Sequence, residues 1–233
     1  EKSIRKLETN GQIEVKLGKK IVITQIIAKL IKPFVDKPNE GQLVFNVDTF
    51  HLKPNAEYNQ QNEALNEFRN KINMFLEKTL KDSKALDVFS LCVVPGKVVW
   101  KLIIDVNIIN NDGNVLDAAL LSVLCSWLTF KLPFFIRKEN KLTNNNKFIY
   151  LTTLHKPFIV SFGIFNHAKE GNKFLLDCNW KEESIMNGNV SVAANIFGEV
   201  VYMQMNSNLQ VSLDEINDML LIVKTKVEEL NKK

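Results

Sequence analysis

Three carboxylates gather between an expected strand and an expected turn in the second half of the chain. Asp177 closes the strand, and Glu182 and Glu183 precede the Met186-Asn187-Gly188 turn. Paired carboxylates can bind Mg²⁺ or serve as general acid and base. A solvated acidic turn has the same composition, so residue types alone leave both interpretations open. We favour the acidic turn and expect no metal.

A polar turn offers a second kind of chemistry. Asn110-Asn111-Asp112-Gly113-Asn114 joins an apolar strand, Val98 to Ile109, to a buried helix expected over Val115 to Phe130. The first backbone amides of a helix have no partner within the helix and can bind an anion. A strand, a turn and a helix in this order can therefore hold a phosphate, if the surrounding side chains permit it.

Four lysines lie on or just after a predicted amphipathic helix over residues 65–80. Lys71, Lys78 and Lys81 stand off its apolar face at separations of seven and three, and Lys84 follows. Such a row could contact RNA phosphates, because backbone recognition needs only positive charge at intervals. It could equally be a solvated basic face. The formal net charge of +4 permits a nucleic-acid partner without arguing for one.

Runs of strands covered by three main helices are expected to position these residues, which is an α+β fold. Polar stretches predict a loop over 51–62 and the looped tip of a hairpin over 138–147. The expected strands are two within 4–31, with turns near Gly11 and Gly18, and others at 43–47, 91–94, 98–109, 148–151, 157–165, 173–177, 190–194 and 200–205. The expected helices cover 65–80, 115–130 and the stretch from Leu213, where Ser212 and Glu215 form a capping box.

Several function classes lack their signatures in this chain. There is no P-loop, Rossmann glycine pattern, GxSxG or kinase motif, and no apolar run long enough to span a membrane. None of the histidines has an HExxH partner, and no cysteine pair has metal-ligand spacing. We expect surface or turn histidines and reduced core cysteines of an intracellular protein: His51, His155, His167, Cys92, Cys125 and Cys178.

The central stretch SLCVVPGKVVWKLIIDVNIINNDGNVLDAA (Ser90–Ala119) resembles the RNase PH-like subunits of the RNA exosome ring. Three further segments resemble the same family in the same order: Lys71–Asp87, Leu154–Phe165 and Leu175–Asn195. The resemblance covers nearly the whole chain from Ile4 onward. The family's Leu-Asp-Gly-Arg leader is missing before the first strand, so we expect the natural protein to have an upstream segment.

This resemblance implies an RNase PH-like fold (ribosomal protein S5 domain 2-like), with mixed or antiparallel sheets covered by helices. It implies a single domain over 1–233 with two similar halves, about 1–134 and about 147–233. Such units form a ring around an RNA channel. The implied partners are the other RNase PH-like ring subunits, cap subunits with S1 and KH domains, and single-stranded RNA, with no cofactor and no membrane. The implied location is the nucleus, the nucleolus and the cytoplasm.

The resemblance also implies the site residues. Active members are phosphorolytic and need an Arg in a Gly-Ser/Thr-Arg turn and two Asp, and this chain has Leu116, Glu183 and Asn189 at those positions. We therefore expect a non-catalytic subunit that takes part in RNA processing and degradation.

This chain retains more of the family's basic helix than of its active-site residues. Lys78, Lys81 and Lys84 match positions that face RNA, and so does Lys71, although the next basic position is Met74. We expect sequence-independent RNA contacts there. The alternative is a phosphorolytic 3′–5′ exoribonuclease with a divergent site around Asp177, Glu182 and Glu183.

Overall fold

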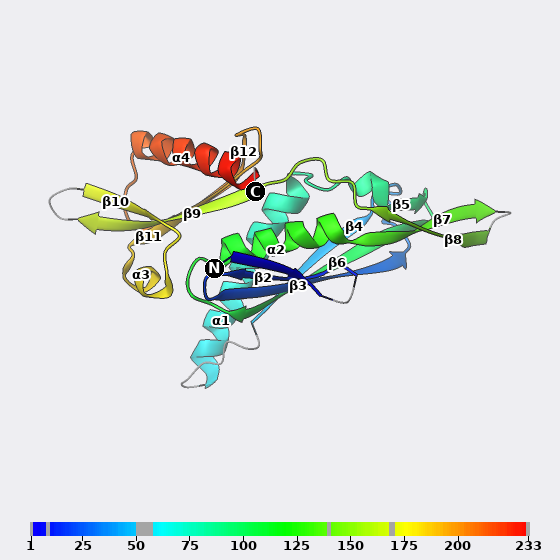
Figure 1. The fold of residues 1–233 in the computed structure, drawn as a ribbon, viewed down its shortest axis with the longest axis horizontal. Helices are drawn as coiled ribbons and strands as arrows, with labels where there is room; N and C mark the ends of the chain where they lie inside the picture. Colours follow the sequence, from blue (N-terminus) through cyan, green and yellow to red (C-terminus); the bar gives the residue numbers. More distant parts are fainter. Residues whose placement is uncertain (1, 8–9, 50–57, 139–140, 168–170, 232–233) are drawn as a thin grey trace.

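The computed structural model describes residues 2–7, 10–49, 58–138, 141–167 and 171–231, and it consists of two larger sheets with a helix between them (Figure 1). The first sheet has the order β1-β2-β3-β6-β4, with β5 paired to β6. Its strands are β1 (Lys2–Lys6), β2 (Gln12–Leu17), β3 (Lys20–Ile31), β4 (Gln42–Asp48), β5 (Cys92–Val94) and β6 (Val98–Asn110). The stretch predicted to form two strands forms three, because Lys2–Lys6 pairs with β2.

Strand β6 is the centre of the first sheet, as its apolar sequence predicts. It pairs antiparallel with β3 and parallel with β4. Alternate side chains, such as Leu102, Ile104 and Val106, are completely buried. A parallel pair needs a long crossover connection, and helix α1 (Tyr58–Leu76) lies within the connection from β4 to β6.

Helix α1 changes its geometry at its end. It continues into the π-helix η1 (Glu77–Asp82), and the 3₁₀ turn η2 (Val88–Leu91) follows. A π-helix has wider turns than an α-helix, so the side chains of η1 are rotated relative to those of α1. The prediction of one regular α-helix over 65–80 is therefore wrong from Glu77 onward. The prediction of a loop as far as residue 62 is also wrong, because α1 begins at Tyr58.

Helix α2 (Val115–Thr129) lies between the two larger sheets. Its small residues allow the close approach that the sequence predicts, since Ala118, Ala119 and Ser122 are completely buried. The Ser122 hydroxyl donates to Thr24 Oγ1 of β3 at 2.7 Å. Residues of both halves of the chain, including Ile159 from the second half, join the hydrophobic core around α2.

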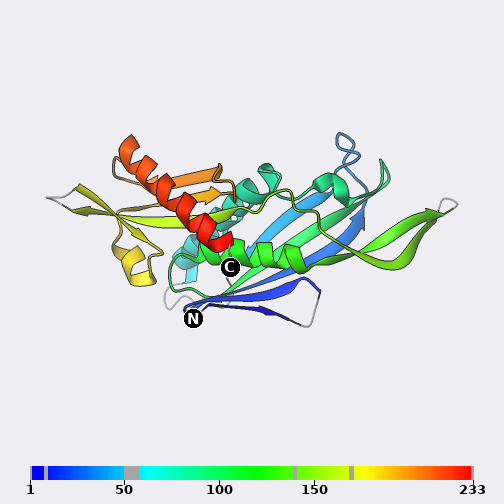
Figure 2. The same ribbon diagram turned by 45° about the horizontal axis from the view of Figure 1, so that its top comes forward.

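The second sheet is antiparallel and has the order β10-β9-β11-β12. Its strands are β9 (Phe158–His167), β10 (Gly171–Leu176), β11 (Gly188–Ala194) and β12 (Val200–Ser207), and helix α3 (Trp180–Ile185) connects β10 to β11. Helix α4 (Leu213–Asn231) crosses one face of this sheet (Figure 2). The predicted capping box begins α4, with the Glu215 carboxylate accepting from the Ser212 amide at 2.7 Å.

The third sheet is a hairpin of β7 (Lys131–Lys138) and β8 (Lys141–Tyr150), which projects from the end of the molecule opposite to β10. The prediction of a looped tip over 138–147 is wrong in its extent, because β8 begins at Lys141. Strands pair through backbone hydrogen bonds, which polar residues can form as well as apolar ones. Within the described ranges, no helix combines the length and the apolar character needed to cross a membrane.

Candidate active site at the start of helix α2

The turn before α2 lies directly against the loop that follows β10. Gly113 and Asn114 have positive φ angles of 81° and 44°. A Cβ atom on Gly113 would lie 2.4 Å from the backbone oxygen of Cys178, so a glycine is required here. Two segments far apart in the sequence therefore meet at the first turn of α2.

A carboxylate of the protein is bound at this turn, at the backbone amide of the residue that precedes α2. Glu183 Oε1 accepts a hydrogen bond from the Asn114 amide at 2.7 Å. The Asn114 side chain donates to Asp117 Oδ2 at 2.8 Å and to Asp177 Oδ1 at 2.9 Å. Lys20 Nζ lies 2.6 Å from the same Asp177 oxygen. Three carboxylates and one lysine thus surround the place where the turn would bind an anion.

Burial changes the ionisation of two of these carboxylates. It raises the pKa of Asp117 to about 7, against the opposing effect of hydrogen bonds from Asn114 and Ser161. Burial also raises the pKa of Glu183, and the hydrogen bond from the Asn114 amide opposes the change. The surroundings therefore disfavour further negative charge at this turn, such as that of an incoming phosphate.

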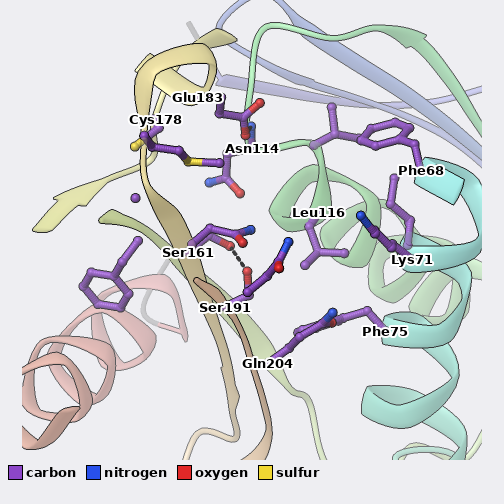
Figure 3. A pocket seen from close by; sticks show the side chains of 17 residues that line it. Phe68, Lys71, Phe75, Asn114, Leu116, Ser161, Cys178, Glu183, Ser191 and Gln204 are labelled. Atoms are coloured by element: carbon purple, nitrogen blue, oxygen red, sulfur yellow. Dashed lines mark hydrogen bonds between the residues drawn. The ribbon is translucent and has the colours of Figure 1, made fainter. Parts of the chain in front are cut away.

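The three residues expected at the family's active-site positions, Leu116, Glu183 and Asn189, line one cavity of about 250 Å³ together with Lys71 of α1 (Figure 3). The side chain of Leu116, in the first turn of α2, carries no donor and no charge that could bind a phosphate. Asn189 belongs to β11, and its amide cannot donate a proton as an acid does. Leu116, Glu183 and Asn189, which the family resemblance assigns to one site, therefore lie around one cavity, and Lys71 lies beside them.

The other lysines of the basic helix lie elsewhere. Lys78 pairs with Asp82 at 2.8 Å, and this hydrogen bond raises the pKa of Lys78. Lys81 and Lys84 line a different cavity of about 840 Å³. The expected row assumed α-helical spacing, but η1 is a π-helix and Lys84 follows it with a positive φ of 57°. The four lysines therefore do not share one cavity.

The acidic stretch divides into separate roles. Glu182 Oε2 accepts from the Asn179 amide at 2.7 Å and completes the capping box of α3. Asp177 and Glu183 instead face the start of α2. Among the residues that the structure describes, no group of three His, Cys, Asp or Glu side chains is placed to hold a metal ion.

The predicted surface histidines and core cysteines have different outcomes. His155 is partly buried, with Nε2 3.0 Å from the Ser83 carbonyl oxygen. His167 ends β9, and His51 lies outside the described residues. The cysteines are free, and Cys178 is buried whereas Cys92 and Cys125 are partly buried.

The sequence did not identify several residues of the site. Lys20, Ser161, Ser191, Gln204 and Asn206 take part in the ion pair or line the cavity. The last four are polar positions in strands whose neighbouring residues are mostly apolar. That pattern is a signal that could have identified the face lining the cavity.

Two family models match the sequence over most of its length. The first describes the 3′ exoribonuclease family, domain 1, and matches residues 6–133. The second describes domain 2 of the same family and matches residues 155–224.

The chain is similar to curated proteins named exosome complex component RRP45. It is 31% identical to the protein of Rattus norvegicus over 93% of this chain and 49% of the relative, and 31% identical to that of Danio rerio over 94% and 56%. The chain thus spans about half the length of these relatives. The sequence also resembles the smaller PM/Scl autoantigen subunit, which is RRP45.

Two solved structures share the fold. An "Archaeal exosome core" chain has a TM-score of 0.79 and 21% identity, covering 99% of this chain and 83% of that one. A chain of the "archaeoglobus fulgidus exosome with RNA bound to the active site" has a TM-score of 0.82 and 20% identity, covering 100% and 86%. The predicted RNase PH-like α+β fold is confirmed. With both domain models matched in order, this chain belongs to the 3′ exoribonuclease family.

Proposed function

We propose that this chain is a non-catalytic RNase PH-like ring subunit of an RNA exosome. The observation that carries the proposal is the hydrogen bond from the Asn114 amide to Glu183, beside an aliphatic Leu116. A carboxylate of the protein is thus bound directly before the first turn of α2, and no arginine is among the described residues that line this cavity.

Electrostatics supports the loss of phosphorolysis. Two like unit charges about 4 Å apart repel by about 4 kcal/mol at the effective dielectric near a protein surface. Removing one preorganised group from an active site typically slows catalysis by about 10²–10³-fold. Here Leu116 and Asn189 each lack such a group, and the carboxylate that remains, Glu183, is bound to the turn itself.

The chain would contribute assembly surfaces and RNA contacts instead. Its partners would be the other RNase PH-like ring subunits, S1/KH cap subunits and single-stranded RNA, with Lys71, Lys78, Lys81 and Lys84 contacting phosphates. The similarity to proteins named as exosome complex components supports this role. Such a subunit would act in the nucleus, the nucleolus and the cytoplasm.

Reconstitution with the other ring subunits tests the proposal. The mixture should form one hetero-oligomer that contains this chain. With single-stranded RNA and inorganic phosphate, neither the isolated chain nor the complex should release nucleoside diphosphates from the RNA 3′ end through this subunit. Phosphate-dependent release that Glu183→Gln abolishes would favour the alternative enzyme. A chain that stays monomeric in the mixture would contradict the ring role.

A further inference from the structure

The face of the second sheet that lines the cavity beside α2 is polar across two adjacent strands. Asn189 lies opposite Asn206, and Ser191 opposite Gln204, in the antiparallel pairing of β11 with β12. Such partners carry their side chains on the same face of a sheet, and all four residues line the cavity. Val190, between them in sequence, is buried in the core beneath α4.

Three of these side chains have unused hydrogen-bonding groups. The side-chain amides of Asn189, Gln204 and Asn206 make no hydrogen bond to any residue in the described part of the chain. The Ser191 hydroxyl differs, because it lies 3.0 Å from the Ser161 hydroxyl, which itself donates to Asp117. The sheet therefore presents free amide donors and acceptors to the cavity.

The opposite wall is apolar with one cation. Phe68 and Lys71 line it from α1, across the cavity from Ser191 (Figure 3), and Phe75 of the same helix is 1% exposed. Lys71 is exposed and forms no ion pair within the described residues. A ligand with a flat polar body and one negative group would meet amides on one side, the partly buried Phe68 ring on the other and an ammonium group beside them.

We propose that this cavity binds one unpaired nucleotide of single-stranded RNA, with its base against the three amides and its phosphate near Lys71. Side-chain amides both donate and accept, which matches the edges of unstacked bases, and bases pack well against aromatic side chains. The second carboxylate oxygen of Glu183 accepts from an exocyclic amino group, so adenine, cytosine and guanine are preferred over uracil.

This inference rests on the proposed function, because it assumes that RNA reaches the subunit, and it adds a choice among bases. Lysine contacts to phosphates cannot provide such a choice. A neutral base also suits the site better than a free anion does, since Asp117, Asp177 and Glu183 surround the start of α2.

The test measures the binding of labelled hexanucleotides to the complex assembled with the other ring subunits, by fluorescence anisotropy. Oligo(A) and oligo(C) should bind more tightly than oligo(U). Gln204→Leu removes one amide at similar volume, and it should lower the affinity for oligo(A) about fivefold, the effect of about one net hydrogen bond. The loss should be smaller for oligo(U). Lys71→Ala should weaken the binding of all three and reduce the salt dependence.

Lys78→Ala is the matched control, because this lysine lies outside the cavity and its loss should weaken all sequences equally. Equal affinities for all three sequences, unchanged by Gln204→Leu, would overturn the nucleotide site while leaving the ring role intact. Failure to assemble would contradict the proposed function itself. Adenosine monophosphate carries the same base and phosphate. Its binding as tightly as oligo(A) would overturn the assignment to an RNA strand.

Discussion

Asp117 is a carboxylate whose ionisation is costly in the folded chain. Its pKa rises from 3.8 to about 7, because burial disfavours the charged form more than the hydrogen bonds from Asn114 and Ser161 favour it. Between about pH 4 and pH 7 the folded chain therefore binds more protons at this residue than the unfolded chain does. The free energy of unfolding must fall as pH rises through this window, and the full cost is present above it.

We predict that Asp117→Asn flattens this pH dependence. One such group contributes at most about 1.4 kcal/mol per pH unit to the free energy of unfolding. The variant should be more stable than the parent above pH 7 and should lose that advantage toward pH 4. Urea unfolding at several pH values measures the slope. The control is Asp218→Asn, at an exposed carboxylate of α4, and the prediction fails if both variants keep the slope of the parent.

At the scale of elements, the turn before α2 depends on its close approach to the loop after β10. Both Gly113 and Gly18 have positive φ angles, but only a Cβ atom on Gly113 would meet neighbouring backbone, whereas nothing lies within 4 Å of one on Gly18. The two glycines therefore separate the cost of the backbone conformation from the cost of the collision.

Gly18→Ala should lower the free energy of unfolding by about 1 kcal/mol, through the left-handed conformation alone. Gly113→Ala should cost at least about 2 kcal/mol, because the turn and the backbone around Cys178 must also move apart. Thermal or urea unfolding of the two variants gives the comparison. Equal losses in the free energy of unfolding for the two variants would show that Gly113 is not in close contact with the backbone around Cys178.

Local sequence patterns correctly predicted three features of the fold. The apolar run predicted the buried strand β6, the small residues predicted the close packing of α2, and the capping box at Ser212 predicted the start of α4. The π-helix η1 was not predicted, because a change in helix geometry leaves no mark in a pattern of apolar residues. The extent of the β7–β8 hairpin was not predicted, because polar residues in β8 resemble those of the loop expected at the tip.

At the scale of the whole molecule, α2 joins the two halves of the chain. Its core includes Leu151, Ile159 and Ala193 from the second half, alongside β-strand residues of the first. The prediction of a single domain over 1–233 therefore has a physical consequence. The strands of both halves should lose their protection from hydrogen exchange in one cooperative transition.

Leu120→Ala, at a position of α2 that is 1% exposed, tests this unity. It should lower the free energy of unfolding by about 2–5 kcal/mol. Hydrogen exchange followed by mass spectrometry should show equal loss of protection in β6 and in β11. A β11 that keeps its protection would mean that the second half is an independent domain.

The site could be predicted only in part. The resemblance to the exosome ring subunits assigned Leu116, Glu183 and Asn189 to one site, and the fold places these residues in one cavity. The contacts that define its chemistry join residues 69 and 157 positions apart, Asn114 with Glu183 and Lys20 with Asp177. No local pattern reports such pairs, because only the packing of the second sheet against α2 brings them together.

The central claim is that the start of α2 does not hold a phosphate, because Glu183 is bound at the turn before it and Leu116 provides no cation. Isothermal titration calorimetry with inorganic phosphate at neutral pH tests this claim most directly. No saturable binding is expected through the millimolar range, either for the isolated chain or for Glu183→Gln, since Leu116 still provides no cation. Tight binding of phosphate that Leu116→Asp abolishes would contradict the account.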